Sequence, residues 1–131
     1  MSNKKTGAVM VVGGGIAGMQ SALDLANAGF YVYLVEKSGS IGGMMSQLDK
    51  TFPTNDCAMR IIAPKLVEVG RHINIELLTL SEVEGISGEE GNFKMKVRKR
   101  ARSINMDLCT GCGSCVENCP VMYEAQVDWA F

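Results

Sequence analysis

The chain has 131 residues, a formal net charge of −1 and 47% hydrophobic residues. This composition supports a packed core and excludes a largely disordered chain, and the near-neutral charge argues against a dedicated nucleic-acid binder. The length suits one modest domain and is short for a complete two-domain flavin or nicotinamide enzyme. Residues 1–7 lack the apolar core of a signal peptide, and no apolar run is long enough to span a membrane. Five cysteines, four of them in one short stretch, suit metal binding in a reducing compartment, so we expect a cytoplasmic protein.

The first predicted unit runs from Val9 to Glu36 as strand, glycine turn, helix and strand. Ala8–Val12 is almost wholly apolar, as expected for a strand buried on both faces of a parallel sheet. The next run has helical apolar periodicity and ends at Gly29, a residue type favoured just beyond a helix. Tyr31–Val35 then predicts a second strand. The order is typical of a Rossmann-like βαβ fold that binds FAD or NAD(P).

Three glycines in this unit have G-x-G-x-x-G spacing, at Gly13, Gly15 and Gly18. They allow a tight turn, close approach of backbone to a pyrophosphate, and tight packing of helix on strand. Glu36 ends the second strand, where an acid accepts hydrogen bonds from an adenosine ribose. The alternative is a glycine-rich turn that serves packing alone.

The segment that follows predicts loops and a broken helix. A glycine-containing loop covers Lys37–Gly43, and a second loop ends in three residues suited to cap a helix, Thr54, Asn55 and Asp56. Cys57–Ile62 predicts one helical turn or more. Because Pro64 disfavours helix at the residue before it, we expect a break there, followed by a short helix to Val69.

Strands dominate the next part of the chain. Ile73–Leu78 predicts a third strand, parallel to the first two. Glu82–Ile86 and Phe93–Arg98 flank a polar, glycine-containing turn and predict a β-hairpin, with the basic side of its second strand facing water. We place a domain boundary after this hairpin, with a dinucleotide-binding domain over 1–103 and a ferredoxin-like segment over 104–131.

The cysteine run is the most specific motif. Its spacing is C-x-x-C-x-x-C-x-x-x-C-P, which is typical of bacterial ferredoxins that hold a 4Fe-4S cluster. The predicted ligands are Cys109, Cys112, Cys115 and Cys119. The alternatives are a zinc knuckle, which normally uses two separated cysteine pairs, and disulfides.

The sequence leaves the fourth ligand open. In two-cluster ferredoxins the last cysteine of such a run serves the other cluster, and this chain has no second run. Either Cys119 closes a single cluster, or Cys119 serves a cluster completed elsewhere and Cys57 supplies the fourth thiolate here. For Cys57 the other reading is a buried, inert thiol. His72, alone of its type, is expected at the surface and not as a ligand.

With both motifs in view, the chain resembles the iron–sulfur flavoprotein A subunit of heterodisulfide reductase. The resemblance extends from about Gly7 to about Val121, and its most specific segment is Leu48–Cys57. It implies FAD, a 4Fe-4S cluster, and partners that are other subunits of such a complex or the missing remainder of the A subunit, with no nucleic acid and no membrane span. The cofactor contacts that we expect are Gly13, Gly15, Ile16, Ala17, Gly18, Glu36, Lys37, Gly43 and Met44, with no catalytic residue assigned.

Three departures from the family pattern bear on activity. Arg60 stands where the family often has a second cysteine, the second ferredoxin run is absent, and the rest of the flavin domain is absent. We therefore expect a fragment, a truncated product or one piece of a split subunit that is not active alone. The leading hypothesis is an electron-transfer component of a heterodisulfide reductase-like complex. The alternatives are a ferredoxin-like carrier with an empty dinucleotide fold and a small NAD-dependent oxidoreductase.

Overall fold

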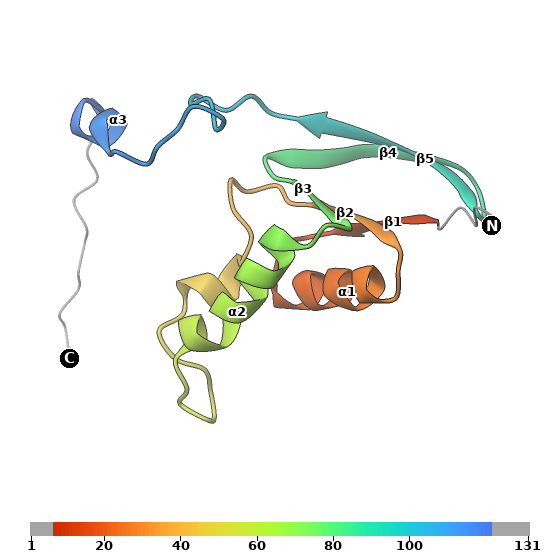
Figure 1. The fold of residues 1–131 in the computed structure, drawn as a ribbon, viewed down its shortest axis with the longest axis horizontal. Helices are drawn as coiled ribbons and strands as arrows, with labels where there is room; N and C mark the ends of the chain where they lie inside the picture. The colour runs from red at the N-terminus through yellow and green to blue at the C-terminus, as the bar shows by residue number, and fades with distance from the viewer. Residues whose placement is uncertain (1–6, 122–131) are drawn as a thin grey trace. The chain divides into compact units, whose positions relative to one another are not determined.

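The computed structural model describes residues 7–121. The chain divides into two compact units, one that ends at Ala101 and one that begins at Arg102 (Figure 1). None of the helices within residues 7–121 is long and apolar enough to cross a membrane.

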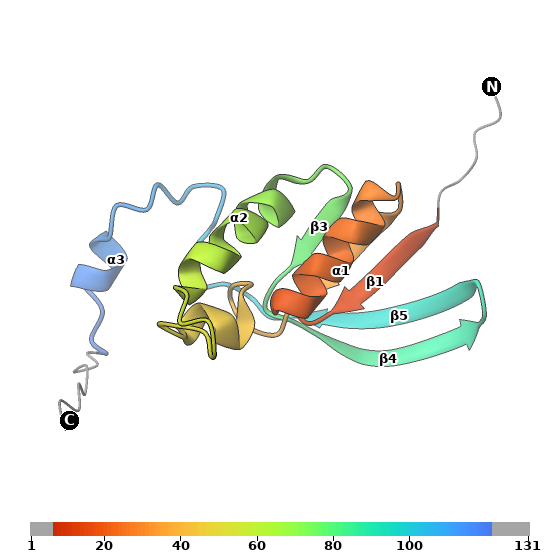
Figure 2. The same cartoon turned by 90° about the horizontal axis from the view of Figure 1, so that it is seen from below.

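The first unit contains a three-stranded parallel sheet in the order β1-β2-β3, with helices on one face and a hairpin on the other (Figures 1 and 2). Because the strands are parallel, their carboxyl ends meet at one edge, which places the turn after β1 beside the residue after β2. The elements of this unit are β1 (Ala8–Val12), α1 (Ile16–Asn27), β2 (Tyr31–Val35), the short 3₁₀ helix η1 (Gly43–Gln47), α2 (Ala58–Arg71), β3 (Ile75–Leu78), β4 (Ser81–Glu89) and β5 (Asn92–Lys99).

The predicted elements β1, α1 and β2 are present, but burial of β1 on both faces is wrong, because none of its residues is buried and Val12 is 64% exposed. Helix α1 buries Met19 and Leu23 against β2, where Val32 and Leu34 are fully buried. The helix ends two residues before Gly29, which adopts a positive φ of +94°. A single apolar face along α1 therefore supplies half of the buried core cluster between helices and sheet, and β2 and α2 supply the other half.

The predicted break at Pro64 is wrong, because α2 runs without interruption from Ala58 to Arg71. Proline removes the N–H that would bond the carbonyl of Arg60, four residues earlier. Arg60 is exposed, so water can reach that carbonyl, while Ile62 and Val69 on the opposite face are buried in the core. Burial of this face on both sides of the proline keeps the helix continuous.

The predicted N-cap residues of this helix are also wrong. Cys57 precedes the first helical residue and makes no side-chain capping bond. The predicted caps belong instead to a hydrogen-bonded loop, in which the Thr51 N–H donates to the Asp56 carbonyl and the Asn55 N–H to the Thr51 carbonyl. Short polar residues suit tight turns as well as caps, so their presence did not decide between the two.

The predicted hairpin is present, with longer strands and a shorter turn than expected. The ladder extends to the pair Glu89 and Asn92, so only Glu90 and Gly91 form the connection. The basic side chains of β5 are exposed as predicted, and both Lys96 and Arg98 pair with Glu84. Strand β3 begins at Ile75, two residues later than predicted.

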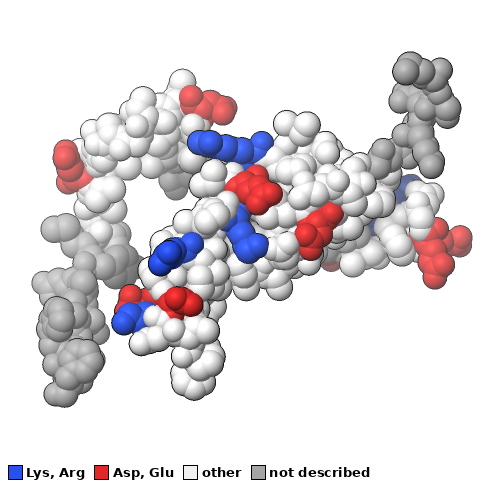
Figure 3. Space-filling model, turned by 60° about the horizontal axis from the view of Figure 1, so that its bottom comes forward, with Lys and Arg blue, Asp and Glu red and all other residues white. Residues whose placement is uncertain are grey.

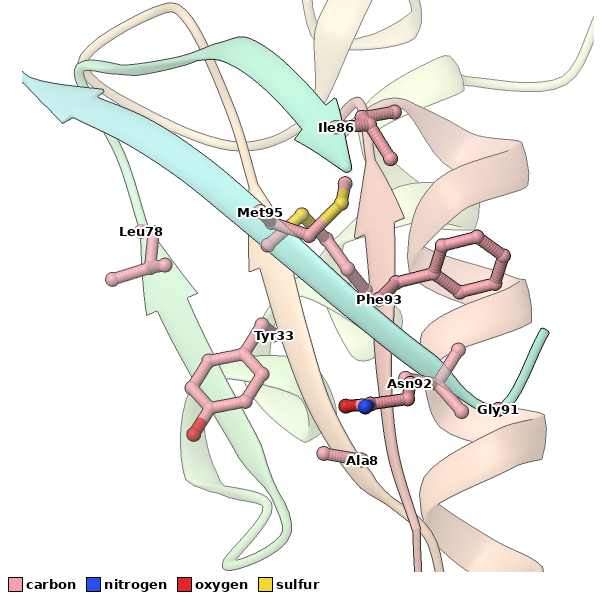
Figure 4. Close-up of a pocket in the computed structure, with 10 residues that line it drawn as sticks. Ala8, Tyr33, Leu78, Ile86, Gly91, Asn92, Phe93 and Met95 are labelled. Atoms are coloured by element: carbon pink, nitrogen blue, oxygen red, sulfur yellow. The ribbon is translucent and has the colours of Figure 1, made fainter. Parts of the chain in front are cut away.

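An open cavity of about 870 Å³ separates the hairpin from the parallel sheet. Its walls are largely apolar, with Tyr33 and Leu78 from the sheet and Ile86, Phe93 and Met95 from the hairpin (Figure 4). The hairpin therefore lies over the sheet without closing a second core against it.

Acidic and basic side chains are interspersed on the face of the molecule shown in Figure 3. In the second unit, the one regular element in the part up to residue 121 is the short helix α3 (Ser114–Glu117).

Candidate functional site

The glycine turn after β1 is tightly built. The Gly13 N–H donates to the Val35 carbonyl at 2.8 Å, which fixes the turn to the end of β2, and Gly13 has a φ of +106°. A Cβ on Gly18 would lie 1.8 Å from the Gly13 carbonyl oxygen, whereas a Cβ on Gly15 would meet nothing within 4 Å. Gly18 therefore fits the packing role, and Gly15 faces open space into which a ligand can approach.

Helix α1 begins directly after this turn. Gly15 is its N-cap residue and supplies no side-chain capping bond, and Ile16 and Ala17 open the first turn. The N–H groups at this end carry the positive end of the helix dipole and suit an anion such as a diphosphate.

Glu36 is engaged within the chain. Its Oε2 accepts from the Gly14 N–H at 2.5 Å, and its Oε1 accepts from the Ser38 N–H and the Ser38 hydroxyl, each at 2.8 Å. Burial alone would raise the pKa of Glu36, but hydrogen bonds from Ser38, Gly14 and the Lys37 N–H outweigh burial and lower this pKa below its ordinary value. The carboxylate is therefore ionised at neutral pH, as ribose recognition requires.

A second glycine pair packs directly on the first turn. The Gly42 N–H donates to the Gly14 carbonyl at 2.7 Å, and a Cβ on Gly43 would lie 2.9 Å from the Gly15 Cα. Met44 follows at the start of η1 and is 70% exposed. The structure thus brings Gly43 beside the turn and leaves the Met44 side chain open to a ligand.

Lys37 points toward the hairpin. Its Nζ lies 3.5 Å from Glu82 Oε1, and Arg100 contacts the same carboxylate. Of the predicted contacts, the glycines, the start of α1 and Glu36 come together, whereas the Lys37 ammonium is paired with β4.

Sequence reasoning missed Gly14, Ser38 and Gly42. Gly14 lies between two glycines of the recognised motif, and a Cβ there would come within 2.7 Å of Ile41 Cγ2 and 3.0 Å of Glu36 Oε2. The run of three consecutive glycines was a visible signal, since the motif itself requires only the outer two.

The cysteines of the second unit are free and exposed. Gly111 and Gly113 adopt positive φ angles of +71° and +85°, which bend the loop sharply. Cys112 Sγ lies 3.5 Å from Ser114 Oγ, and hydrogen bonds to Ser114 and Thr110 lower the pKa of the Cys112 thiol to about 7. Four soft thiols in eleven residues suit iron–sulfur iron, so the donor chemistry fits the group. Within residues 7–121, however, no three His, Cys, Asp or Glu side chains are gathered as a metal site.

Cys57 and His72 complete the set of candidate residues. Cys57 is exposed, so the reading of a buried thiol is wrong. His72 is half-buried; its Nε2 lies 3.3 Å from Asn27 Oδ1 and its Nδ1 accepts from the Asn74 N–H. These partners give His72 a structural role between α1 and the entry to β3.

Comparison with known proteins identifies the family. A family model described as FAD dependent oxidoreductase matches residues 8–91, more than half of the chain. The chain belongs to the FAD-dependent oxidoreductase family. The match covers the glycine turn, Glu36 and the first hairpin strand. A second model, described as a 4Fe-4S binding domain, matches residues 102–122.

Individual relatives confirm the resemblance to the A subunit of heterodisulfide reductase. The chain is 62% identical over 112 residues to the A subunit of H(2):CoB-CoM heterodisulfide,ferredoxin reductase from Methanothermobacter thermautotrophicus, covering 86% of this chain and 17% of that protein. It is 55% identical over 120 residues to iron–sulfur A subunit 1 of the CoB–CoM heterodisulfide reductase from Methanopyrus kandleri, covering 92% of this chain and 18% of that protein. The chain therefore spans less than a fifth of the length of these relatives.

A solved structure supports the fold. L-proline dehydrogenase from P. horikoshii aligns with a TM-score of 0.57 and 25% identity, over 72% of this chain and 19% of that one. The present chain thus has the Rossmann-like fold that its sequence predicted, and the two family models support FAD and a 4Fe-4S cluster as its cofactors.

Proposed function

We propose that this chain is the dinucleotide-binding part of an electron-transfer iron–sulfur flavoprotein of the heterodisulfide reductase type. It relays electrons between FAD, a 4Fe-4S cluster and partner subunits. The proposal rests on the occurrence of two features in one chain. An open glycine turn lies against an ionised Glu36, and a ferredoxin cysteine run follows in the sequence. The two parts correspond to domains over 1–103 and 104–131.

Each residue has a binding task in this function. The turn at Gly13, Gly15 and Gly18 and the first residues of α1, Ile16 and Ala17, receive the diphosphate of FAD. Glu36 accepts a ribose hydroxyl, while Gly43 and the exposed Met44 lie on the path toward the flavin ring. Lys37 holds the loop after β2 through its pair with Glu82.

The cysteine segment supplies the second carrier. Cys109, Cys112, Cys115 and Cys119 would hold the cluster through their thiolates, and because all four are free thiols they are available as ligands. When bound, the flavin exchanges electron pairs or single electrons and the cluster exchanges single electrons.

The partners follow from the relatives. Those proteins are named as A subunits of heterodisulfide reductases, and this chain spans less than a fifth of their length. We infer that the remainder of such a protein, or other subunits of such a complex, completes the flavin pocket. The free thiols of the cysteine run suit a reducing compartment, which makes the cytoplasm the proposed location.

Anaerobic purification tests the proposal. The protein should contain iron and sulfide in the 4:4 ratio expected for one 4Fe-4S cluster. Addition of FAD should give the absorbance bands of bound flavin. A Gly15→Val variant is the matched control, because its side chain would fill the open space beside the turn; it should keep its iron and lose flavin. A purified protein that contains no iron and does not bind FAD would refute the proposal.

A second function has one observation in its favour. Most acceptor positions of Glu36 are already occupied by groups of this chain. That arrangement favours a ferredoxin-like carrier or docking fragment whose dinucleotide fold stays empty. Its signature is a broad cluster absorbance with no flavin uptake at any FAD concentration.

A further inference from the structure

The buried peptide group of Gly14 depends on two partners. Its N–H donates to Glu36 Oε2 at 2.5 Å, and its carbonyl accepts from the Gly42 N–H at 2.7 Å. A buried N–H without an acceptor is strongly unfavourable, and here the acceptor is a side chain 22 residues away. The conformation of the glycine turn is therefore tied to the position of one carboxylate.

Glu36 is itself fixed through its backbone. Its N–H donates to the Leu78 carbonyl at 2.9 Å, and its carbonyl accepts from the Ser81 N–H at 2.9 Å. The Ser38 carbonyl accepts from the Leu80 N–H at 2.9 Å. The link between β3 and β4 thus holds the segment that carries the acid.

The carboxylate is fixed by Ser38. Both the N–H and the hydroxyl of Ser38 lie 2.8 Å from Glu36 Oε1. The same hydroxyl lies 2.7 Å from the Ser40 carbonyl oxygen, so its single hydrogen has two acceptors within reach.

Counting acceptors shows how a ribose could enter. A carboxylate has about four lone-pair positions, and Gly14 and Ser38 fill three of them. The Lys37 N–H is also directed at this carboxylate, so a ribose hydroxyl that enters shares or takes the fourth position while the bonds from Gly14 and Ser38 stay in place.

We propose that Glu36 and Ser38 form a positioning pair that fixes the Gly14 N–H, and with it the diphosphate-binding turn, before a dinucleotide binds. The inference rests on the proposed function, and it adds Ser38 to the residues that set affinity for the adenosine diphosphate part of the cofactor. Ser38 acts through Glu36, whereas Glu36 itself touches the ribose.

The pair can be tested without ligand. In the NMR spectrum of the whole chain, an amide proton bonded to a carboxylate lies downfield, so the Gly14 resonance reports the bond directly. Glu36→Gln should move this resonance strongly upfield, although its amide oxygen can still accept. Ser38→Ala should move it partway, Ser38→Thr should restore it, and Ser40→Ala is the control that should leave it in place. An unmoved Gly14 resonance in either Glu36→Gln or Ser38→Ala would overturn the proposal.

Ligand titration supplies the second readout. With ADP and with FAD as probes, Ser38→Ala should bind about tenfold more weakly, the effect of one lost charge-assisted hydrogen bond. Ser38→Thr and Ser40→Ala should bind as the unaltered chain does. Tighter binding by Ser38→Ala would show that the hydroxyl competes with ribose, and would refute the positioning role. Failure of the unaltered chain to bind ADP or FAD would count against the proposed function, while the Gly14 resonance would still decide on the pair.

Discussion

Two glycines inside helices should respond in opposite directions to the same substitution. Gly18 lies in α1 and Gly70 lies in α2. A Cβ on Gly18 would come within 1.8 Å of the Gly13 carbonyl oxygen and 3.0 Å of its carbon, whereas a Cβ on Gly70 meets nothing within 4 Å. Gly18→Ala should therefore destabilise the protein, and Gly70→Ala should stabilise it.

The expected magnitudes follow from packing and helix propensity. Alanine is favoured over glycine inside a helix by about 1 kcal/mol, which is a gain in both variants. At Gly18 the new methyl group meets backbone that cannot rotate away, and overpacking of this kind costs about 3 kcal/mol. The net loss at Gly18 is about 2 kcal/mol, while Gly70, near the helix end, should gain about 0.5 kcal/mol.

Urea unfolding followed by circular dichroism measures both changes in the free energy of unfolding. Because Gly70→Ala carries the same chemical change in an open position, it controls for helix propensity. FAD binding gives an independent check, since displacement of Gly13 should weaken it in Gly18→Ala alone. A Gly18→Ala protein as stable as Gly70→Ala would refute the close contact.

Three further predictions concern the acid, the cofactor and the cluster. Because the pKa of Glu36 is lowered on folding, its contribution to stability is present above the ordinary glutamate pKa of 4.5 and is lost as the pH falls through the folded value. The stability of Glu36→Gln should therefore depend less on pH in that window. Identical acid-unfolding curves for the variant and the unaltered protein would contradict this. FAD should bind more tightly than NADP, because the Glu36 carboxylate repels a 2′-phosphate; competitive titration decides, and a preference for NADP would rule the assignment out. Cys119→Ser should lose the cluster while Cys57→Ala keeps it, because the local run needs no long-range loop closure. Iron content and electron paramagnetic resonance of the reduced protein measure this, and an unaltered cluster in Cys119→Ser would reverse the ligand assignment.

Local sequence patterns predicted the first half of the fold well. The strands Ala8–Val12 and Tyr31–Val35 are short apolar runs, and the helix that starts at Ile16 has one apolar face. Gly13 follows the first strand directly, and Gly29 lies just beyond the helix. Such features depend on residues that are close together in the chain, so they can be recognised in a single sequence. The same holds for the hairpin, whose turn residues and alternating β5 side chains were visible.

Features that depend on distant contacts were not predictable. The local rule for Pro64 was outweighed by burial of Ile62 and Val69 against α1 and the sheet. The position of Glu36 after a strand indicated an acid at the site, but its bonds to Gly14 and Ser38 arise from side-chain torsions and from the path of the β3–β4 link. The approach of Gly43 to Gly15 likewise joins two loops that no short-range pattern connects.

The open cavity beneath the hairpin implies an uneven distribution of stability. Among the described residues, the buried apolar side chains all belong to α1, α2 and β2, while β4 contributes only Ser81 and β5 contributes none. Lifting the hairpin from the sheet would therefore expose little that is buried, whereas separating α1 from β2 would open the core. Amide hydrogens of β5 should exchange with solvent through small openings, and those of β2 only through global unfolding. The outer part of the hairpin can therefore move without opening the core, whereas its base at Ser81 stays bonded to Glu36 and so to the segment that fixes the glycine turn.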